Sequence, residues 1–128
     1  MKKVVTLIIA SALILTSCSS TSSATNLDSA EFAGKIVETD VVTLDVRTAG
    51  EFMAGHINGA INIDVEGNTF DAEIANLDKS KTYSVYCQSG RRSLIAVDKM
   101  ATAGFASLFN LENGIANWST NGWPVVTS

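Results

Sequence analysis

The chain has 128 residues, enough for one domain with a single modest hydrophobic core. Hydrophobic residues make up 46% of the sequence and charged residues 17%, which is typical of a globular protein. The formal net charge of −4 argues against nucleic acid as a partner, because the phosphate backbone attracts basic surfaces.

The first predicted element is a short apolar segment at the N-terminus. Two lysines follow Met1, residues 4–15 are apolar except for Thr6 and Ser11, and small polar residues come next. A basic start, an apolar stretch and a small-residue cleavage region are typical of a secretory signal peptide, which we place at residues 1–17. The apolar stretch is too short to span a bilayer comfortably as a permanent helix. The alternative is an N-terminal helix buried in the folded domain.

The end of this segment, Leu15-Thr16-Ser17-Cys18, resembles the lipobox of bacterial lipoprotein signals. The resemblance implies cleavage before Cys18 and a diacylglycerol on its thiol, which would hold the protein on a membrane without a spanning helix. Ser19 resembles a signal for outer-membrane sorting in Gram-negative bacteria. We therefore expect an exported, lipid-anchored protein of the bacterial cell envelope that faces the periplasm. Ordinary signal cleavage nearby is the alternative.

The sequence contains two cysteines, Cys18 and Cys87. An exported protein normally pairs its cysteines, but a lipid on Cys18 would prevent this and leave Cys87 as a lone, reactive thiol. A disulfide between the two and an inert buried Cys87 are the alternatives. Without Lys2 and Lys3 the chain carries 7 basic and 13 acidic side chains, a net charge of −6. A small anionic substrate would therefore depend on a local positive field at one site.

After a tether of small and polar residues at 18–26, we expect a folded domain at residues 27–128. In this domain, apolar and β-branched segments alternate with segments of helical periodicity. The predicted strands are 41–46, 60–63, 82–87 and 105–111, and the predicted helices are 28–37, 48–53, 70–77, 93–103 and 115–120. The alternation indicates an α/β fold with a central, mainly parallel sheet and helices on both faces. The apolar helix faces are expected to include Phe32, Ile36 and Val37 in the first helix, and Leu94, Ile95, Val97, Met100 and Ala101 in the helix at 93–103.

The segment that carries the chemistry lies between the predicted strand 82–87 and the predicted helix 93–103. Cys87 stands at the carboxyl end of the strand, where parallel sheets bind their ligands. The following loop runs into a helix N-terminus, whose backbone N–H groups favour negative charge, so we expect a largely ionised thiolate. Gly90 allows the loop to curl. Arg91 and Arg92 add positive charge for an incoming anion.

This arrangement suits a thiolate that attacks either a sulfane sulfur or a phosphoryl or arsenyl group. The sequence has three arginines, and two of them, Arg91 and Arg92, lie close to the thiol in the chain. The third, Arg47, follows the strand 41–46 and is expected at the same edge of the sheet. Arginine is the preferred residue for bidentate anion recognition. The alternative is that Arg91 and Arg92 only pair with surface acids.

Three ordered motifs, within residues 27–126, resemble those of rhodanese domains. They are Leu44-Asp45-Val46-Arg47 with Glu51-Phe52 and Gly55-His56-Ile57-Asn58-Gly59-Ala60-Ile61-Asn62, then Tyr86-Cys87-Gln88-Ser89-Gly90-Arg91-Arg92-Ser93, and then Gly114, Trp118 and Gly122-Trp123-Pro124-Val125. The resemblance implies a single-domain rhodanese with the three-layer α/β fold of that family. It also implies a sulfurtransferase that takes sulfane sulfur from thiosulfate or a related donor as a persulfide on Cys87, with no metal and no organic cofactor.

The resemblance also assigns roles to individual residues. Cys87 is expected to be catalytic, and Asp45 and Arg47 are expected to support the site, Asp45 by bonding nearby backbone N–H groups or by holding Arg47. The expected substrate-binding residues are Gln88, Ser89, Gly90, Arg91, Arg92 and Ser93. His56, the only histidine, is either a general base or, as we favour, part of a structural turn, because a preformed thiolate needs no base. The sequence shows no His and Cys cluster for a metal.

The length of the loop separates sulfur chemistry from phosphate chemistry within this resemblance. Related phosphatases place an arginine six positions after the cysteine, where this sequence has Ser93, whereas Arg92 follows five positions after Cys87. The shorter loop is similar to that of the sulfurtransferases and favours them. Gln88 stands where many rhodaneses have arginine, so the preferred donor is left open.

The expected partners are a small anionic sulfur donor and an acceptor that is cyanide, a small thiol or a thiol protein. Contact with a membrane is expected only through the lipid on Cys18, and no contact with nucleic acid is expected. Two other functions stay open. One is a rhodanese-like module that binds sulfur or a partner without turnover, and the other, which we rank lower, is a phosphatase or arsenate reductase.

Overall fold

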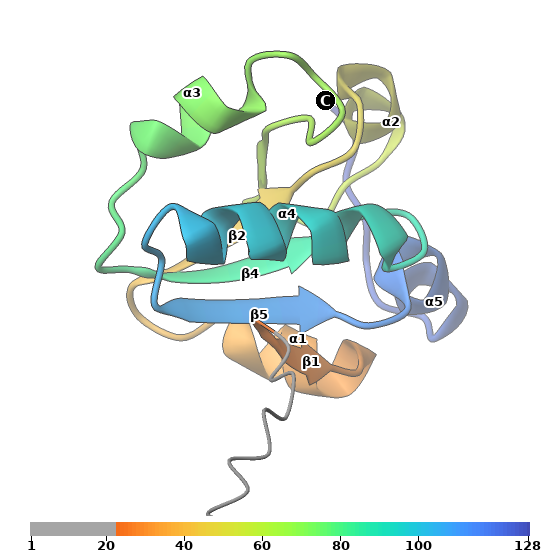
Figure 1. Cartoon of the computed structure of the whole chain (residues 1–128). Helices are drawn as coiled ribbons and strands as arrows, with labels where there is room; N and C mark the ends of the chain where they lie inside the picture. The colour runs from red at the N-terminus through yellow and green to blue at the C-terminus, as the bar shows by residue number, and fades with distance from the viewer. Residues whose placement is uncertain (1–22) are drawn as a thin grey trace, which may run out of the picture.

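The computed structural model describes residues 23–128, which fold around one five-stranded sheet (Figure 1). All paired strands are parallel, in the order β1-β5-β4-β2-β3. The strands are β1 (Thr25–Leu27), β2 (Val41–Asp45), β3 (Ile61–Asn62), β4 (Thr82–Tyr86) and β5 (Ser107–Leu111). The helices are α1 (Ser29–Lys35), α2 (Ala49–Ala54), α3 (Phe70–Ala75), α4 (Arg91–Thr102) and α5 (Gly114–Thr120). The predicted α/β class with a central parallel sheet is confirmed.

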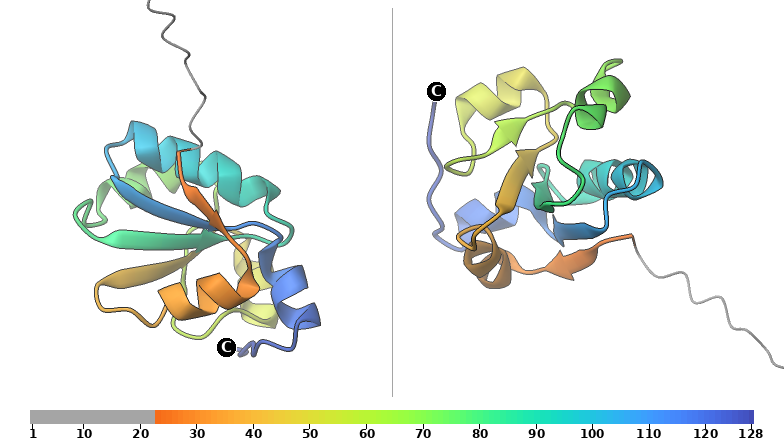
Figure 2. Two further views of the ribbon diagram at one scale, coloured as in Figure 1. Left: turned by 90° about the horizontal axis from the view of Figure 1, so that it is seen from below. Right: turned by 90° about the vertical axis from the view of Figure 1, so that its left-hand side faces the viewer.

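Helices cover both faces of the sheet and give the molecule three layers (Figure 2). Apolar side chains of α3 and α4 pack on one face, and those of α1 and α5 pack on the other. The first set includes Phe70, Ile74, Ala96, Val97 and Met100, and the second set includes Phe32, Ile115 and Trp118. Successive side chains of a strand point to opposite faces, so Val85 and Cys87 join the α4 side while Tyr86 joins the α1 side.

The segment that we expected to be a tether already contains the first strand. β1 pairs with β5, Ala24 is buried, and the Asn110 amide donates a hydrogen bond to Asn26 Oδ1 at 3.0 Å. The folded domain therefore begins before Leu27, contrary to the prediction. This segment lacks large apolar side chains because an edge strand is held mainly by its ladder of backbone hydrogen bonds.

Two predicted apolar helix faces are wrong in part. α1 ends before Val37, which is 81% exposed. In α4, Leu94 and Ile95 are 42% and 51% exposed, whereas Val97 and Met100 are buried against the sheet. A helix that lies on a sheet buries only one stripe of its surface, so apolar residues beside that stripe stay in contact with solvent.

Polar side chains fix the starts of the first two helices. Asp28 Oδ1 accepts the Glu31 N–H at 2.8 Å, and Glu31 Oε2 accepts the Asp28 N–H at 2.9 Å, which is a reciprocal capping box. Thr48 Oγ1 accepts the Glu51 N–H at 3.3 Å and caps α2. The α2 cap thereby holds Glu51 opposite Arg92, the second residue of α4.

Candidate active site

Cys87 directly follows β4 at the carboxyl edge of the sheet, and its side chain is completely buried. Its Sγ accepts the N–H of Gly90 at 3.1 Å. The thiol also donates to Ser93 Oγ at 3.4 Å, and the Ser93 hydroxyl donates to the Gly90 carbonyl oxygen at 3.1 Å. Gly90 and Ser93 therefore hold the sulfur inside the loop that connects β4 with α4.

The sulfur lies at the N-terminus of α4, a helix of 12 residues. Gly90 is the N-cap residue, with a φ of +95°, and no side chain of residues 23–128 caps this helix by a hydrogen bond. Unpaired N–H groups and the positive end of the helix dipole stabilise negative charge at such a terminus. A cysteine in this environment is suited to act as a thiolate nucleophile.

Asp45 and Arg47 form a buried ion pair at the end of β2, with Arg47 Nη2 2.6 Å from Asp45 Oδ2. The Arg47 backbone N–H donates to Asp45 Oδ1 at 2.9 Å. Arg47 also donates to the Gly55 carbonyl oxygen at 2.7 Å and to Gln88 Oε1 at 3.4 Å. Burial disfavours the charged form of Arg47, but the hydrogen bond and negative charge of Asp45 outweigh burial and hold the pKa of Arg47 above its ordinary value. Arg47 therefore links β2, the end of α2 and the loop after Cys87.

Arg92 binds carboxylates on the side of α2. Its Nη1 and Nη2 donate to the two carboxylate oxygens of Glu51 at 2.8 and 2.9 Å, and its Nε lies 3.7 Å from Glu66 Oε1. The hydrogen bonds with Glu51 raise the pKa of Arg92, and those with Arg92 lower the pKa of Glu51 to about 2. Two acids thus match the charge of Arg92.

Arg91 is exposed and has no ion pair among residues 23–128, so its charge is available to an incoming anion.

We expect the pair of Glu51 with Arg92 to make stability depend on acid pH. The pKa of Glu51 is about 2 in the folded protein against an ordinary 4.5, so on acidification the unfolded chain takes up this proton first. The stabilisation is complete above pH 4.5 and is lost as the pH falls to about 2. Urea midpoints of wild type and Glu51→Gln should therefore converge over this range. Glu112→Gln, which removes an exposed acid, is the control for the change in net charge. Urea midpoints of wild type and Glu51→Gln that stay equally far apart from pH 4.5 down to about 2 would contradict the prediction.

A groove of about 380 Å³ opens beside the loop at the same edge of the sheet. Arg47, Glu51, Gln88 and Ser119 are among its lining residues. Gln88 and its neighbour Ser89 are exposed, in contrast to the completely buried Cys87. Of the loop residues 87–93, Gln88 is the one that lines this groove.

His56 is held as a structural residue. Its Nδ1 lies 2.9 Å from the Phe52 carbonyl oxygen, and its ring stacks on that of Phe52 with 3.8 Å between centroids. Its backbone exchanges two hydrogen bonds with Val126 in an antiparallel bridge. These contacts favour the structural turn over the general base.

The next residue, Ile57, donates its N–H to the buried Tyr86 hydroxyl at 3.0 Å. Burial, followed by the charge of Asp45, raises the pKa of that hydroxyl.

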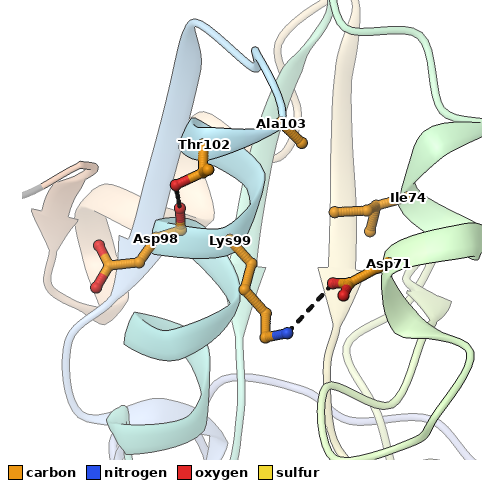
Figure 3. A pocket seen from close by; sticks show the side chains of 6 residues that line it. All are labelled: Asp71, Ile74, Asp98, Lys99, Thr102 and Ala103. Carbon is orange, nitrogen blue, oxygen red and sulfur yellow. Dashed lines mark hydrogen bonds and ion pairs between the residues drawn. The ribbon is translucent and has the colours of Figure 1, made fainter.

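A second cavity, of about 420 Å³, lies between α3 and α4 (Figure 3). Its lining residues are Asp71, Ile74, Asp98, Lys99, Thr102 and Ala103. Lys99 crosses the opening to pair with Asp71 at 3.2 Å. This cavity lies at the end of α4 opposite Cys87 and is not part of the site around the thiol.

Some expectations fall outside these observations. The predicted signal peptide, the tether residues 18–22 and the predicted lipid attachment site Cys18 lie outside the described residues. Within residues 23–128, no helix is both long enough and apolar enough to cross a membrane. The same part of the chain brings no three His, Cys, Asp or Glu side chains together in a group that could hold a metal ion.

Two parts of the site were not predicted from the sequence. Glu51 was expected as a residue of the helix 48–53 and of the motif that resembles rhodanese domains, but its pairing with Arg92 was not predicted. Gly114 was expected as part of the C-terminal motif that resembles rhodanese domains, but the contact of the turn at 112–116 with the loop was not predicted. The dipeptide Asn113-Gly114, which is typical of turns, is the local signal at this place.

Comparisons with known proteins agree with this geometry. Residues 28–121 match the family described as Rhodanese-like domain. A sulfurtransferase of Allochromatium vinosum is 29% identical over 101 residues, which are 78% of this chain and 92% of that protein. The chloroplastic thiosulfate sulfurtransferase 16 of Arabidopsis thaliana is 35% identical over 91 residues, 63% of this chain and 76% of that protein. A crystal structure of a rhodanese-related protein from Thermoplasma volcanium has a TM-score of 0.71 and 30% identity, and the match covers 81% of this chain and 99% of that chain. Because the family match spans most of the sequence, the chain belongs to the rhodanese-like domain family.

Proposed function

We propose that this rhodanese-like domain is a sulfurtransferase that carries sulfane sulfur as a persulfide on Cys87. The observation that carries the proposal is the position of the sulfur at the uncapped N-terminus of α4, where Sγ accepts the Gly90 N–H at 3.1 Å. Such a site stabilises both a thiolate and the negative outer sulfur of a persulfide.

The proposed reaction has two steps. The Cys87 thiolate attacks the outer sulfur of thiosulfate, a sulfur–sulfur bond forms, and sulfite leaves with the electron pair of the broken bond. Cyanide or a thiolate then attacks the outer sulfur of the persulfide and takes it up, and Cys87 leaves as a thiolate. The cycle needs no other oxidant or reductant, and no metal takes part.

Relatives and loop chemistry support thiosulfate as the donor. The Arabidopsis thaliana relative is named a thiosulfate sulfurtransferase and the Allochromatium vinosum relative a sulfurtransferase. Arg91, which has no ion pair in the described part of the chain, offers its positive charge to a dianionic donor. Gln88 offers an amide in the groove, and its Oε1 lies within hydrogen-bond distance of Arg47.

Mass spectrometry and a turnover assay test the proposal together. After treatment with thiosulfate, the intact protein should gain one sulfur atom on Cys87, and addition of cyanide should release thiocyanate and restore the original mass. A persulfide that no acceptor removes would instead indicate a sulfur-binding module without turnover. An unmodified Cys87 that hydrolyses phosphate esters would replace the proposal by phosphatase chemistry.

We also propose that the protein acts at the bacterial cell envelope, exported and held by a lipid on Cys18. The support is the basic, apolar and small-residue pattern of residues 1–17 and the lipobox-like residues before Cys18. Metabolic labelling with an alkyne fatty acid should mark the wild-type protein and leave Cys18→Ser unlabelled and released from membranes. Equal labelling of both proteins would exclude this anchor.

A further inference from the structure

The turn between β5 and α5 lies directly against the loop that holds Cys87. We call residues 112–116 the α5 turn. The Ile115 N–H donates to the Cys87 carbonyl oxygen at 2.9 Å, and the Ala116 N–H donates to the Gln88 carbonyl oxygen at 3.1 Å. Both N–H groups belong to the first turn of α5, where a helix has no partner for them of its own.

Two glycines make this close approach possible. Gly114 has a φ of +67°, and a Cβ on it would collide with the Gln88 carbonyl and lie 2.6 Å from the Ser89 nitrogen. Gly90 has a φ of +95°, and a Cβ on it would collide with the Glu112 carbonyl oxygen. The loop and the α5 turn therefore pack backbone against backbone, with each glycine facing a peptide group of the other segment.

The two hydrogen bonds fix the direction of the peptide groups after Cys87. In a trans peptide the N–H points opposite to the C=O of the same unit. Since the Cys87 and Gln88 carbonyls point at the α5 turn, the N–H groups of Gln88 and Ser89 point away from it. The next N–H, that of Gly90, reaches the sulfur itself.

We infer that the α5 turn orients the loop for sulfur transfer and that Gly114 is a positioning residue for Cys87. This inference rests on the proposed function. By holding two carbonyls on one side, the turn aims successive N–H groups of the loop at the reacting sulfur and at the outer sulfur of the persulfide. A shift of this loop by about 1 Å would misdirect the N–H groups that face the reacting sulfur and the outer sulfur.

Gly114→Ala tests the inference, and Gly122→Ala is its matched control. Gly114 begins α5 and has a φ of +67°, and Gly122 follows the end of α5 and has a φ of +82°. A Cβ on Gly122, however, would meet nothing within 4 Å. Both variants bear the strain of a left-handed alanine, and only one pushes on the loop. We expect Gly114→Ala to lower kcat for thiocyanate formation about a hundredfold, with a smaller change in KM, and Gly122→Ala to stay within about twofold of wild type.

Alkylation of Cys87 by iodoacetamide gives a readout that does not depend on the proposed function. The rate at neutral pH should fall in Gly114→Ala, and its pH profile should move away from that shared by wild type and Gly122→Ala. A second variant, Ala116→Pro, removes the N–H that binds the Gln88 carbonyl at an exposed position in the first turn of α5, and it should show the same change. It decides the question if Gly114→Ala does not fold.

The two proposals fail in different ways. A wild-type protein that forms no persulfide would defeat the proposed function, while the alkylation profiles would still report on the α5 turn. Wild-type sulfur transfer combined with unchanged kcat and alkylation in the folded Gly114 or Ala116 variant would overturn the inference alone.

Discussion

Replacing Cys87 by serine is expected to abolish sulfur transfer, with a loss in kcat of at least about a thousandfold. A serine hydroxyl stays protonated at neutral pH and cannot carry a sulfane sulfur. Serine has nearly the volume of cysteine, and its oxygen can still accept the Gly90 N–H and bond with Ser93. The chemistry should therefore be lost while the fold is kept.

Thiocyanate formation from thiosulfate and cyanide, together with the mass of the thiosulfate-treated protein, measures this loss. Ser84→Ala is a matched control in the strand that leads to Cys87, because Ser84 is completely buried in β4 and its hydroxyl has no hydrogen-bond partner among the described residues. Its removal should leave turnover unchanged and cost little stability. Undiminished turnover in Cys87→Ser would show that Cys87 is not the residue that carries the sulfur.

Replacing Asp45 by alanine is expected to lower the free energy of unfolding by about 3–5 kcal/mol. Asp45 is fully buried and Arg47 is 4% exposed, so the substitution leaves a buried guanidinium without its counter-charge. The Arg47 backbone N–H loses its acceptor as well. Urea denaturation monitored by tryptophan fluorescence measures the change.

Two controls give this prediction its scale. Glu38→Ala breaks the exposed pair of Lys35 with Glu38, in which Glu38 is 54% exposed, and should cost at most about 1 kcal/mol. Joint replacement of both buried charges, Asp45→Leu with Arg47→Met, should recover most of the loss because no unpaired charge is left behind. A cost for Asp45→Ala as small as that for Glu38→Ala would show that the buried pair does not hold the end of β2.

The sequence predicts those parts of the fold whose signals are local. The strands β2 and β4 are apolar, β-branched or aromatic, and α4 has helical periodicity, so the unit of strand, loop and helix around Cys87 can be located from the sequence. The strand β1 could not be found in this way. It has no apolar run and depends on backbone pairing with β5, which lies about eighty residues further along the chain.

The site divides along the same line. Asp45 and Arg47 are two residues apart, so their pairing could be anticipated as one of two roles for Asp45. The bonds of Arg92 to Glu51 join α4 to α2 across 41 residues, and the sequence alone left open whether Arg92 attracts an anion or pairs with acidic side chains. The contacts of Gly114 with the loop are of the same long-range kind. The order of residues in the chain does not indicate that a Cβ at Gly114 would collide with the carbonyl of the distant Gln88.

The parallel sheet gives the molecule a direction. Every strand starts at one edge and ends at the other, so Ser23 and Ala24, which lead into β1 beside the start of β5, lie at the edge opposite Cys87. The residues before Ser23 therefore join the domain at the edge of the sheet that lies opposite Cys87. A protein attached to a bead through its N-terminus would therefore be held from the edge of the sheet opposite Cys87, and the edge that carries the candidate site would stay clear of the attachment.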